Sequence, residues 1–330
     1  MVSRHRVSQI HAGRVLPEGV IAWCLSRRFR IPYLCYVHGE EVTTLSASRE
    51  LRWLARLVVS GSAALIANSH STARLLVEQW GARSSAVSII HPGVDTTQFR
   101  PATRDPAARA RLGWGDRAVV LTVGRLQKRK GHDQMIRALH TVRRAIPDVL
   151  YAIIGDGEER PALKALVDRE GLSGHVAFLG ECSDRDLIAC YQQCDLFVLP
   201  NRQVGQDIEG FGIVLLEAQA CGRAVVAGAS GGTAETMQVP QTGRVVDCQY
   251  PEVLAATIVD LLGDRDRLGR MGVAAREWVA RFDWSTLGHQ AQALFSRPAL
   301  ARRGRAAIEP VPHGRGADRA ARPVAPALHT

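Results

Sequence analysis

The sequence lacks any uninterrupted run of about 18 apolar residues, the length that a membrane-spanning helix needs. Its first residues are polar and basic, which is not the pattern of a secretory leader peptide. The seven cysteines are odd in number and scattered, and no two form a C-x-x-C pair, so the sequence indicates neither a disulfide framework nor a cysteine-based zinc site. We therefore expect a soluble, cytoplasmic protein with reduced, structural thiols.

Lysine and aromatic residues are scarce. Only three of the 42 basic residues are lysines, and aromatic residues make up 5% of the chain. Half of the net charge of +10 comes from residues 297–330, where seven arginines face two acidic residues. This segment is rich in Pro, Ala, Gly and Arg without apolar periodicity, and we predict a disordered basic tail. Because basic residues are not interleaved with aromatic ones, we expect no nucleic-acid partner.

Both halves of the chain alternate short apolar or β-branched runs with longer amphipathic runs. This alternation is typical of βα units around a parallel sheet, so the sequence predicts an α/β protein. Predicted strands cover residues 7–12, 32–38, 64–69 and 86–91, then 117–124, 149–155, 175–180, 195–200, 223–228 and 242–247. Predicted helices cover residues 18–29, 46–60, 70–80, 131–145, 158–171, 184–193, 212–221 and 232–237, followed by 250–262, 264–281 and 284–296.

A chain of 330 residues favours two domains, because single cores stop growing well below that length. We assign residues 1–100 to a first Rossmann-like domain and 101–116 to a linker with one short helix. Residues 117–281 make a complete doubly wound domain, and 282–296 make a closing helix. The first domain has room for only about four strands, so we predict that it is incomplete and lacks its initial βα units.

A basic loop follows the first strand of the second half. The stretch VGRLQKRKGH, residues 123–132, contains Arg125 and Lys130 between Gly124, which ends the strand, and Gly131, which opens a helix. Two of the three lysines of the chain fall in this loop. Cationic side chains beside a strand end and a helix N-terminus suit a phosphate, although an ordinary solvated loop is the alternative.

A second loop pairs carboxylates with glycines. In EGFGIVLLE, residues 209–217, Glu209 follows the strand at 195–200 and Glu217 lies in the next helix. Gly210 and Gly212 leave backbone N–H groups uncovered at the helix start. A carboxylate beside a basic phosphate loop can accept hydrogen bonds from neutral hydroxyls. A ligand with both phosphates and hydroxyls, such as a nucleotide sugar, reconciles the two loops.

The combination of motifs resembles the retaining GT-B glycosyltransferases, the group 1 family that includes bacterial mannosyltransferases. The resemblance covers about residues 8–296. The motifs that carry it are, in order, IANSHSTARLL, IIHPGVDTTQF, GRLQKRKG, IIGDGEER, EGFGIVLLEAQACG and SGGTAE. It implies a GT-B fold, with two Rossmann-like doubly wound domains facing a cleft.

The resemblance also implies roles for single residues on the donor side. Arg125 and Lys130 would bind the donor diphosphate, Glu209 the hydroxyls of the transferred sugar, and Glu217 the ribose. Further donor-binding residues would be Gly124, Cys182 near the base, and the backbone of Gly210, Phe211, Gly212 and Ile213.

On the acceptor side, the resemblance places His38 in YVHGEE beside the donor sugar. From the residues alone, a structural histidine is the alternative. Glu40 and Glu41 either face the acceptor or occupy the first turn of a helix, where the helix dipole favours acidic residues. Arg14 either meets an acidic acceptor or lies on the surface.

The implied reaction moves a hexosyl unit from a GDP- or UDP-linked sugar to a glycan or lipid-linked acceptor, with retention at the anomeric carbon. The resemblance implies no catalytic metal and no cofactor beyond the donor substrate, and places the protein in the cytoplasm with an option of peripheral contact at the inner membrane face. Two alternatives stay open: a truncated nucleotide-sugar-binding remnant without turnover, and a GT-B enzyme of another class, such as a sugar-nucleotide epimerase.

Overall fold

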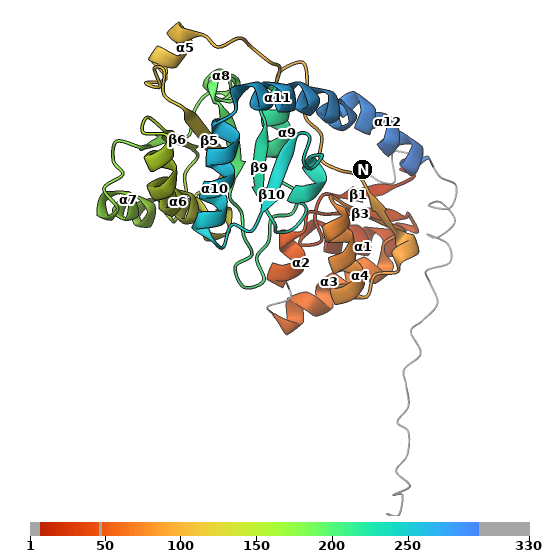
Figure 1. The fold of residues 1–330 in the computed structure, drawn as a ribbon. Helices are drawn as coiled ribbons and strands as arrows, with labels where there is room; N and C mark the ends of the chain where they lie inside the picture. Colours follow the sequence, from red (N-terminus) through yellow and green to blue (C-terminus); the bar gives the residue numbers. More distant parts are fainter. Residues whose placement is uncertain (1–6, 46–47, 297–330) are drawn as a thin grey trace, which may run out of the picture.

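The computed structural model describes residues 7–45 and 48–296, which form two α/β domains joined by a linker (Figure 1). The predicted disordered tail at 297–330 lies outside the described residues. Each domain is built on a parallel sheet with helices packed against it, so the predicted fold class is confirmed. No helix in the described part of the chain is both long and apolar enough to cross a bilayer.

The N-terminal domain has a four-stranded parallel sheet in the order β1-β2-β3-β4 within the described residues. The strands are β1 (Ile10–Ala12), β2 (Tyr33–Val37), β3 (Ala64–Ala67) and β4 (Val87–Ile89), and the helices between them are α1 (Glu18–Phe29), α2 (Glu40–Thr44), α3 (Arg49–Gly61) and α4 (His70–Trp80). Every predicted strand of this half has a counterpart. No range was predicted for helix α2, but it places Glu40 and Glu41 in its first turn, as one of the two alternatives for these residues expected.

The C-terminal domain has a six-stranded parallel sheet in the order β10-β9-β8-β5-β6-β7. Its strands are β5 (Val119–Val123), β6 (Leu150–Ile154), β7 (Val176–Gly180), β8 (Leu196–Leu199), β9 (Val225–Gly228) and β10 (Gly243–Val246). Its helices are α6 (His132–Ala145), α7 (Arg160–Arg169), α8 (Asp184–Gln193), α9 (Ile213–Ala220), α10 (Pro251–Leu262) and α11 (Arg265–Val279). The segment predicted as a helix at 232–237 is instead a single 3-10 turn, η4 (Thr233–Thr236).

The strand order of this sheet places two loops side by side. The chain runs outward from β5 to β6 and β7, then returns to β8 on the other side of β5. Ligands of doubly wound sheets bind at such a reversal, at the carboxyl ends of the two central strands. The loops that leave β5 and β8 are the basic loop and the loop that contains Glu209.

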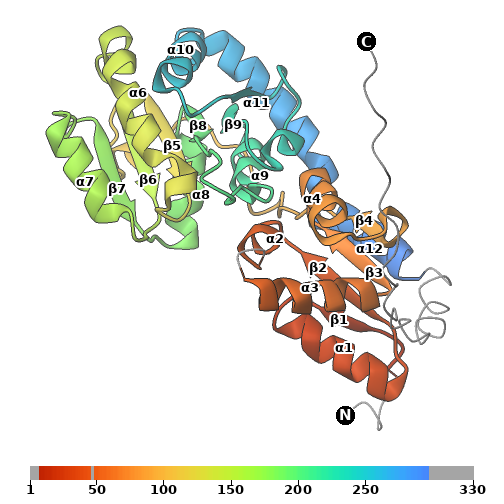
Figure 2. The ribbon, with the colours of Figure 1, turned by 90° about the horizontal axis from the view of Figure 1, so that it is seen from below.

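The last helix, α12 (Trp284–Phe295), ties the two domains together. It continues from the C-terminal domain and lies beside β4 of the N-terminal sheet (Figure 2). Leu294 packs with Leu34 and Ile66 on one face of that sheet. A backbone bridge between Val94 and Asp283 joins the same two segments. The N-terminal sheet therefore buries one face partly under the C-terminal end of the described chain.

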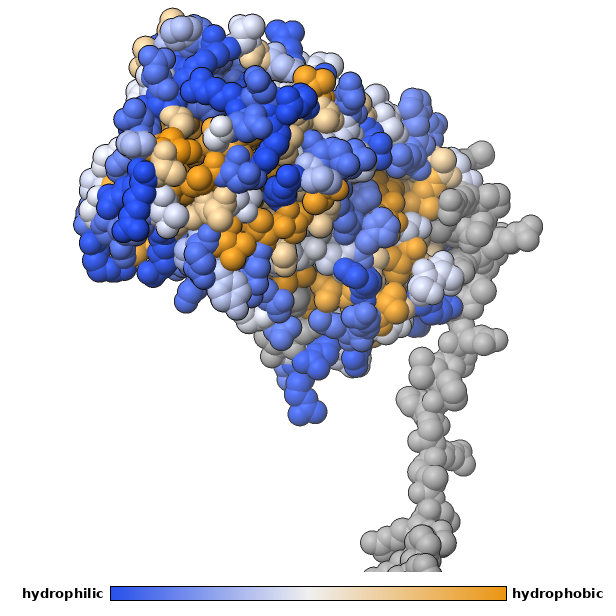
Figure 3. All heavy atoms as spheres, viewed as in Figure 1, coloured by the Kyte–Doolittle hydropathy of each residue, from blue (hydrophilic) through white to orange (hydrophobic). Residues whose placement is uncertain are grey.

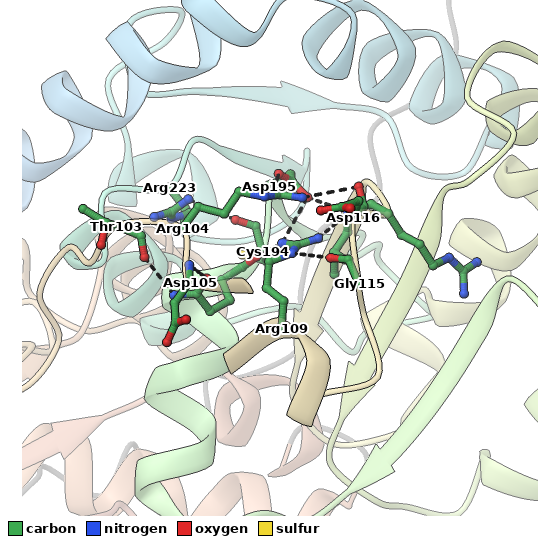
Figure 4. A network of polar contacts seen from close by, with 12 residues as sticks. Thr103, Arg104, Asp105, Arg109, Gly115, Asp116, Cys194, Asp195 and Arg223 are labelled. Carbon is green, nitrogen blue, oxygen red and sulfur yellow. Dashed lines mark hydrogen bonds and ion pairs between the residues drawn. The ribbon is translucent and has the colours of Figure 1, made fainter. Parts of the chain in front are cut away.

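The linker helix α5 (Pro106–Arg111) is anchored by a buried arginine (Figure 4). The Arg109 side chain is 1% exposed and donates to the backbone carbonyls of Gly115 (2.8 Å), Arg117 (2.5 Å) and Gln193. Asp195 lies 3.6 Å from the guanidinium and also pairs with Arg104. Burial lowers the pKa of Arg109, and the Asp195 carboxylate opposes that effect. The network fixes the linker against the six-stranded sheet of the C-terminal domain.

Candidate functional site

A buried ionic cluster forms where the loops after β5 and β8 meet. Glu209 Oε2 accepts from Arg129 Nη1 at 2.6 Å and from Lys130 Nζ at 2.5 Å. The three side chains are only 9 to 11% exposed. Arg129 and Lys130 thus share one carboxylate in a partly desolvated place. The Coulomb energy between these charges is larger there than in water.

Glycines allow these loops to pack closely, because glycine has no side chain. Gly131 has φ +72°, and a Cβ atom there would lie 1.8 Å from the Pro200 carbonyl oxygen. Gly231 has φ +70°, and a Cβ atom there would lie 1.7 Å from the Glu209 carbonyl oxygen. Only glycine fits such contacts. The SGGTAE segment therefore packs against the backbone of the loop that contains Glu209.

Arg129 has the largest set of charged partners at the site, and it was not among the predicted site residues. Besides Glu209, its guanidinium lies 3.3 Å from Asp207 and 3.3 Å from Glu40 of the N-terminal domain. Burial raises the pKa of Asp207, an effect that Arg129 partly offsets. The predicted Arg125 is exposed and contacts none of these carboxylates in the described structure. The structure thus brings Lys130, not Arg125, to Glu209.

The N-terminal domain supplies the facing wall. His38 follows β2, is exposed, and donates from Nε2 to the Gly13 carbonyl at 2.9 Å. The backbone of His38 lies against Gly210, where a Cβ atom would be 2.1 Å from the His38 carbonyl oxygen. Asn68 donates to that carbonyl at 2.7 Å, and Ser69 donates to the Gly210 carbonyl at 3.0 Å. The two domains therefore touch at the glycines of the Glu209 loop.

A cavity of about 240 Å³ lies between the domains at this point. Six of the predicted site residues line it: His38, Glu209, Gly210, Phe211, Gly212 and Ile213. Glu40, Asn68, Pro92 and Arg129 complete the lining. Gly212 has φ +89° and begins α9 without a side-chain cap, so backbone N–H groups of this helix start are free to meet an anion. Gly124 lies next to the Lys130 side chain, because a Cβ atom there would be 3.7 Å from Lys130 Cε.

Five predicted site residues do not line this cavity: Gly124, Arg125, Lys130, Cys182 and Glu217. Glu217 is on α9 and accepts from the Tyr191 hydroxyl at 2.6 Å. Burial raises the pKa of Glu217, and the Tyr191 hydrogen bond opposes that effect. Cys182 is exposed in the turn after β7, and Arg14 is exposed after β1. The structure leaves the roles predicted for Glu217 and Cys182 as predictions.

Two family models match this chain. Residues 105–278 match the family model of the group 1 glycosyl transferases, and residues 1–98 match that of glycosyltransferase family 4. A GDP-mannose-dependent alpha-(1-6)-phosphatidylinositol monomannoside mannosyltransferase of Mycolicibacterium smegmatis is 35% identical over 303 residues, covering 90% of this chain and 78% of that protein. The protein of the same description from Mycobacterium tuberculosis is 36% identical, over 87% of this chain and 75% of its own length.

Solved structures resemble the whole described fold. Anabaena HepE in complex with UDP superposes with a TM-score of 0.79 at 26% identity, over 89% of this chain and 80% of HepE. A sucrose-phosphate synthase from Thermosynechococcus elongatus superposes with a TM-score of 0.77 at 26% identity, over 89% of this chain and 74% of that one. Together with the two facing Rossmann-like domains and the cavity between them, these matches show that the chain belongs to the group 1 glycosyltransferases of GT-B fold.

Proposed function

We propose that this chain transfers a mannosyl unit from GDP-mannose to a lipid-linked acceptor of the phosphatidylinositol mannoside class, with retention at the anomeric carbon. The observation that carries the proposal is the buried pairing of Lys130 and Arg129 with Glu209 at the switch point of the donor-side sheet. The choice of mannose and of guanine rests on the relatives described above, which are GDP-mannose-dependent.

The donor diphosphate binds at the basic loop after β5. Lys130 and the open N-terminus of α9 stabilise the negative charge of the two phosphates, and Arg125 turns in from its exposed position to join them. Lys130 exchanges its bond to Glu209 for one to a phosphate oxygen. This exchange leaves Glu209 to accept hydrogen bonds from hydroxyls of the sugar. Glu217, held by Tyr191, receives the ribose hydroxyls.

The reaction takes place on the face of the sugar toward the N-terminal domain. The bond between the anomeric carbon and the phosphate oxygen breaks, and a bond from that carbon to the acceptor oxygen forms on the same side. The acceptor proton passes to an oxygen of the departing phosphate. His38 lies across the cavity from Glu209 and orients the sugar. Glu40 and Glu41, at the start of α2, border the path of the acceptor.

The N-terminal domain also offers a surface suited to a lipid bilayer. On α3, Trp53 is 63% and Leu51 41% exposed, and Arg49 and Arg56 are exposed as well. Aromatic and apolar side chains next to arginines are typical of helices that lie in the interface of an anionic membrane. Figure 3 shows further apolar residues in separate groups over both domains. Peripheral contact of this kind would place a lipid-linked acceptor at the cleft.

Product analysis tests the proposed reaction. Full-length protein incubated with GDP-mannose and phosphatidylinositol monomannoside is expected to add one hexose to the lipid, as measured by mass spectrometry. NMR of the anomeric proton is expected to show the same configuration as in the donor. The opposite configuration would overturn retention. Donor binding without any product would instead favour a nucleotide-sugar-binding protein without turnover.

A further inference from the structure

Three potential metal ligands meet on the other side of the Glu209 loop, where the two domains join. His70 begins α4, His91 follows β4, and Glu235 lies in η4 of the C-terminal domain. Glu235 Oε2 lies 2.8 Å from His70 Nδ1 and 3.1 Å from His91 Nε2. The three donor atoms all lie within 4.8 Å of one another. Residues far apart in the chain, and from both domains, therefore point to one place.

Neighbouring groups hold the carboxylate of Glu235 in position. Its two oxygens also accept from the backbone N–H groups of His70 (2.8 Å) and Ser71 (3.0 Å). Burial raises the pKa of Glu235, but the hydrogen bonds from His91 and from the backbone and side chain of His70 outweigh burial and lower it to about 2. Four hydrogen bonds thus fix the orientation of the Glu235 carboxylate.

The ring of His91 is held by packing. Its centroid lies 5.2 Å from that of Phe211 and 5.6 Å from that of Phe282. The His91 side chain is 22% exposed and that of Glu235 is 20% exposed, whereas His70 is 68% exposed. Two ligands are thus preorganised, and the third can adjust its rotamer to an ion.

A cavity gives an ion access to this place. It has a volume of about 540 Å³ and is lined by His70, His91 and Glu235 together with Trp278, Arg281 and Phe282. It shares none of its lining residues with the cavity of about 240 Å³ beside Glu209. A bound ion would have room for water as a further ligand. It would also lie apart from the reacting sugar, so no step of the transfer passes through it.

Glu235 has more partners than the capping of a helix requires. The backbone contacts of Glu235 already cap α4, yet both imidazoles are also directed at the same carboxylate oxygen. Two histidines and one glutamate form the ligand set of many zinc sites, with bonds of about 2.0 to 2.2 Å. Tetrahedral bonds of that length separate donor atoms by about 3.3 Å, so the observed 2.8 and 3.1 Å need to widen only slightly.

We propose that His70, His91 and Glu235 bind one divalent transition-metal ion, with Zn²⁺ the best match, and that this ion joins the N-terminal to the C-terminal domain. His70 and His91 belong to the first domain and Glu235 to the second, so the ion stabilises the arrangement in which the domains touch. The proposal does not depend on the identity of the sugar or of the acceptor.

Titration of the metal-free full chain with Co²⁺ tests this site without an activity assay. Wild-type protein is expected to develop the visible absorption of tetrahedral Co²⁺ at one ion per chain, and Zn²⁺ is expected to abolish it. His70→Asn with His91→Asn is expected to weaken binding by more than about 100-fold, because loss of two ligands exceeds the 10- to 100-fold cost of losing an outer-shell partner. His140→Asn is the matched control, because His140 pairs with Glu170 at 2.7 Å in the C-terminal domain.

Three outcomes would overturn the proposal. The first is no visible absorption in the wild type. The second is equal absorption in the wild type and the double variant. The third is a near-ultraviolet thiolate band, which would place the ion at an exposed cysteine such as Cys24 or Cys182. Circular dichroism checks that the double variant is folded. Glu235→Gln gives a second test, because the amide oxygen can still accept the backbone bonds while the anionic ligand is lost.

Discussion

Replacement of Glu209 by glutamine is expected to lower turnover by about 100- to 1000-fold, the cost typical of removing one preorganised group that acts on the transition state. The same change is expected to leave GDP affinity equal to that of the wild type or higher. The reason is that Glu209 competes with the diphosphate for Lys130, at 2.5 Å, and for Arg129, at 2.6 Å. Steady-state transfer rates and calorimetry with GDP measure the two effects separately.

Asp207→Asn is the matched control for this experiment. Asp207 also contacts Arg129, at 3.3 Å, but its side chain is 50% exposed and it does not contact Lys130 in the described structure. A change of only a few-fold is expected for this variant, because exposed ion pairs contribute little. Turnover of Glu209→Gln at the wild-type rate would show that Glu209 does not bind the transferred sugar. A large loss of GDP affinity would show that Glu209 does not compete with the diphosphate.

Replacement of Lys130 by alanine is expected to reduce turnover by about 100- to 1000-fold and to weaken GDP binding as well. Charge grows on the diphosphate as it departs. Lys130 pairs with Glu209, whereas the other buried cation, Arg129, is also paired with Glu40 and Asp207. The change removes the side chain that stabilises that charge. Transfer rates and calorimetry with GDP, both at fixed salt concentration, give the measurement.

Lys128→Ala provides the comparison, because Lys128 lies in the same 3-10 turn but is exposed. It removes the same charge from the same loop without touching the buried cluster. Near wild-type rates are expected for Lys128→Ala. Equal losses of turnover in both variants would mean that the loop acts only through its overall charge. Wild-type turnover and GDP affinity in both variants would mean that the diphosphate binds elsewhere.

The positions of the loops could be predicted because they depend on local patterns. The short apolar runs that end at Gly124 and Pro200 form parallel strands, and the carboxyl ends of parallel strands meet at one edge. The sequence therefore predicts that the stretches after β5 and β8 lie at the same edge of the sheet, and the structure shows the two strands to be adjacent. The helix bounds agree closely for the same reason: α1, α4 and α8 match the predicted ranges.

The choice of the buried cation could not be predicted from local patterns. Lys128, Arg129 and Lys130 follow one another, and nothing in their order says which side chains turn inward. The answer depends on Gly131, whose contact with Pro200 turns the loop toward β8. Glu40 reaches Arg129 from the other domain. These are contacts between distant segments, and a single sequence does not reveal them.

The same limit applies to His70, His91 and Glu235. Glu235 lies 165 residues from His70 and 144 from His91 along the chain, and no spacing motif connects them. SGGTAE is one of the motifs that carry the family resemblance, and its glutamate is the residue that reaches the other domain. Only the arrangement of the two domains brings the three side chains together.

Calorimetric titration of the full chain with GDP-mannose, beside UDP-glucose, tests the central claim most directly. That claim is that the cluster of Arg129, Lys130 and Glu209 holds a nucleotide-sugar donor. We predict one molecule of GDP-mannose bound per chain, with clearly weaker binding in Lys130→Ala. Negligible heat for every nucleotide sugar tested, or the same affinity in Lys130→Ala as in the wild type, would contradict it.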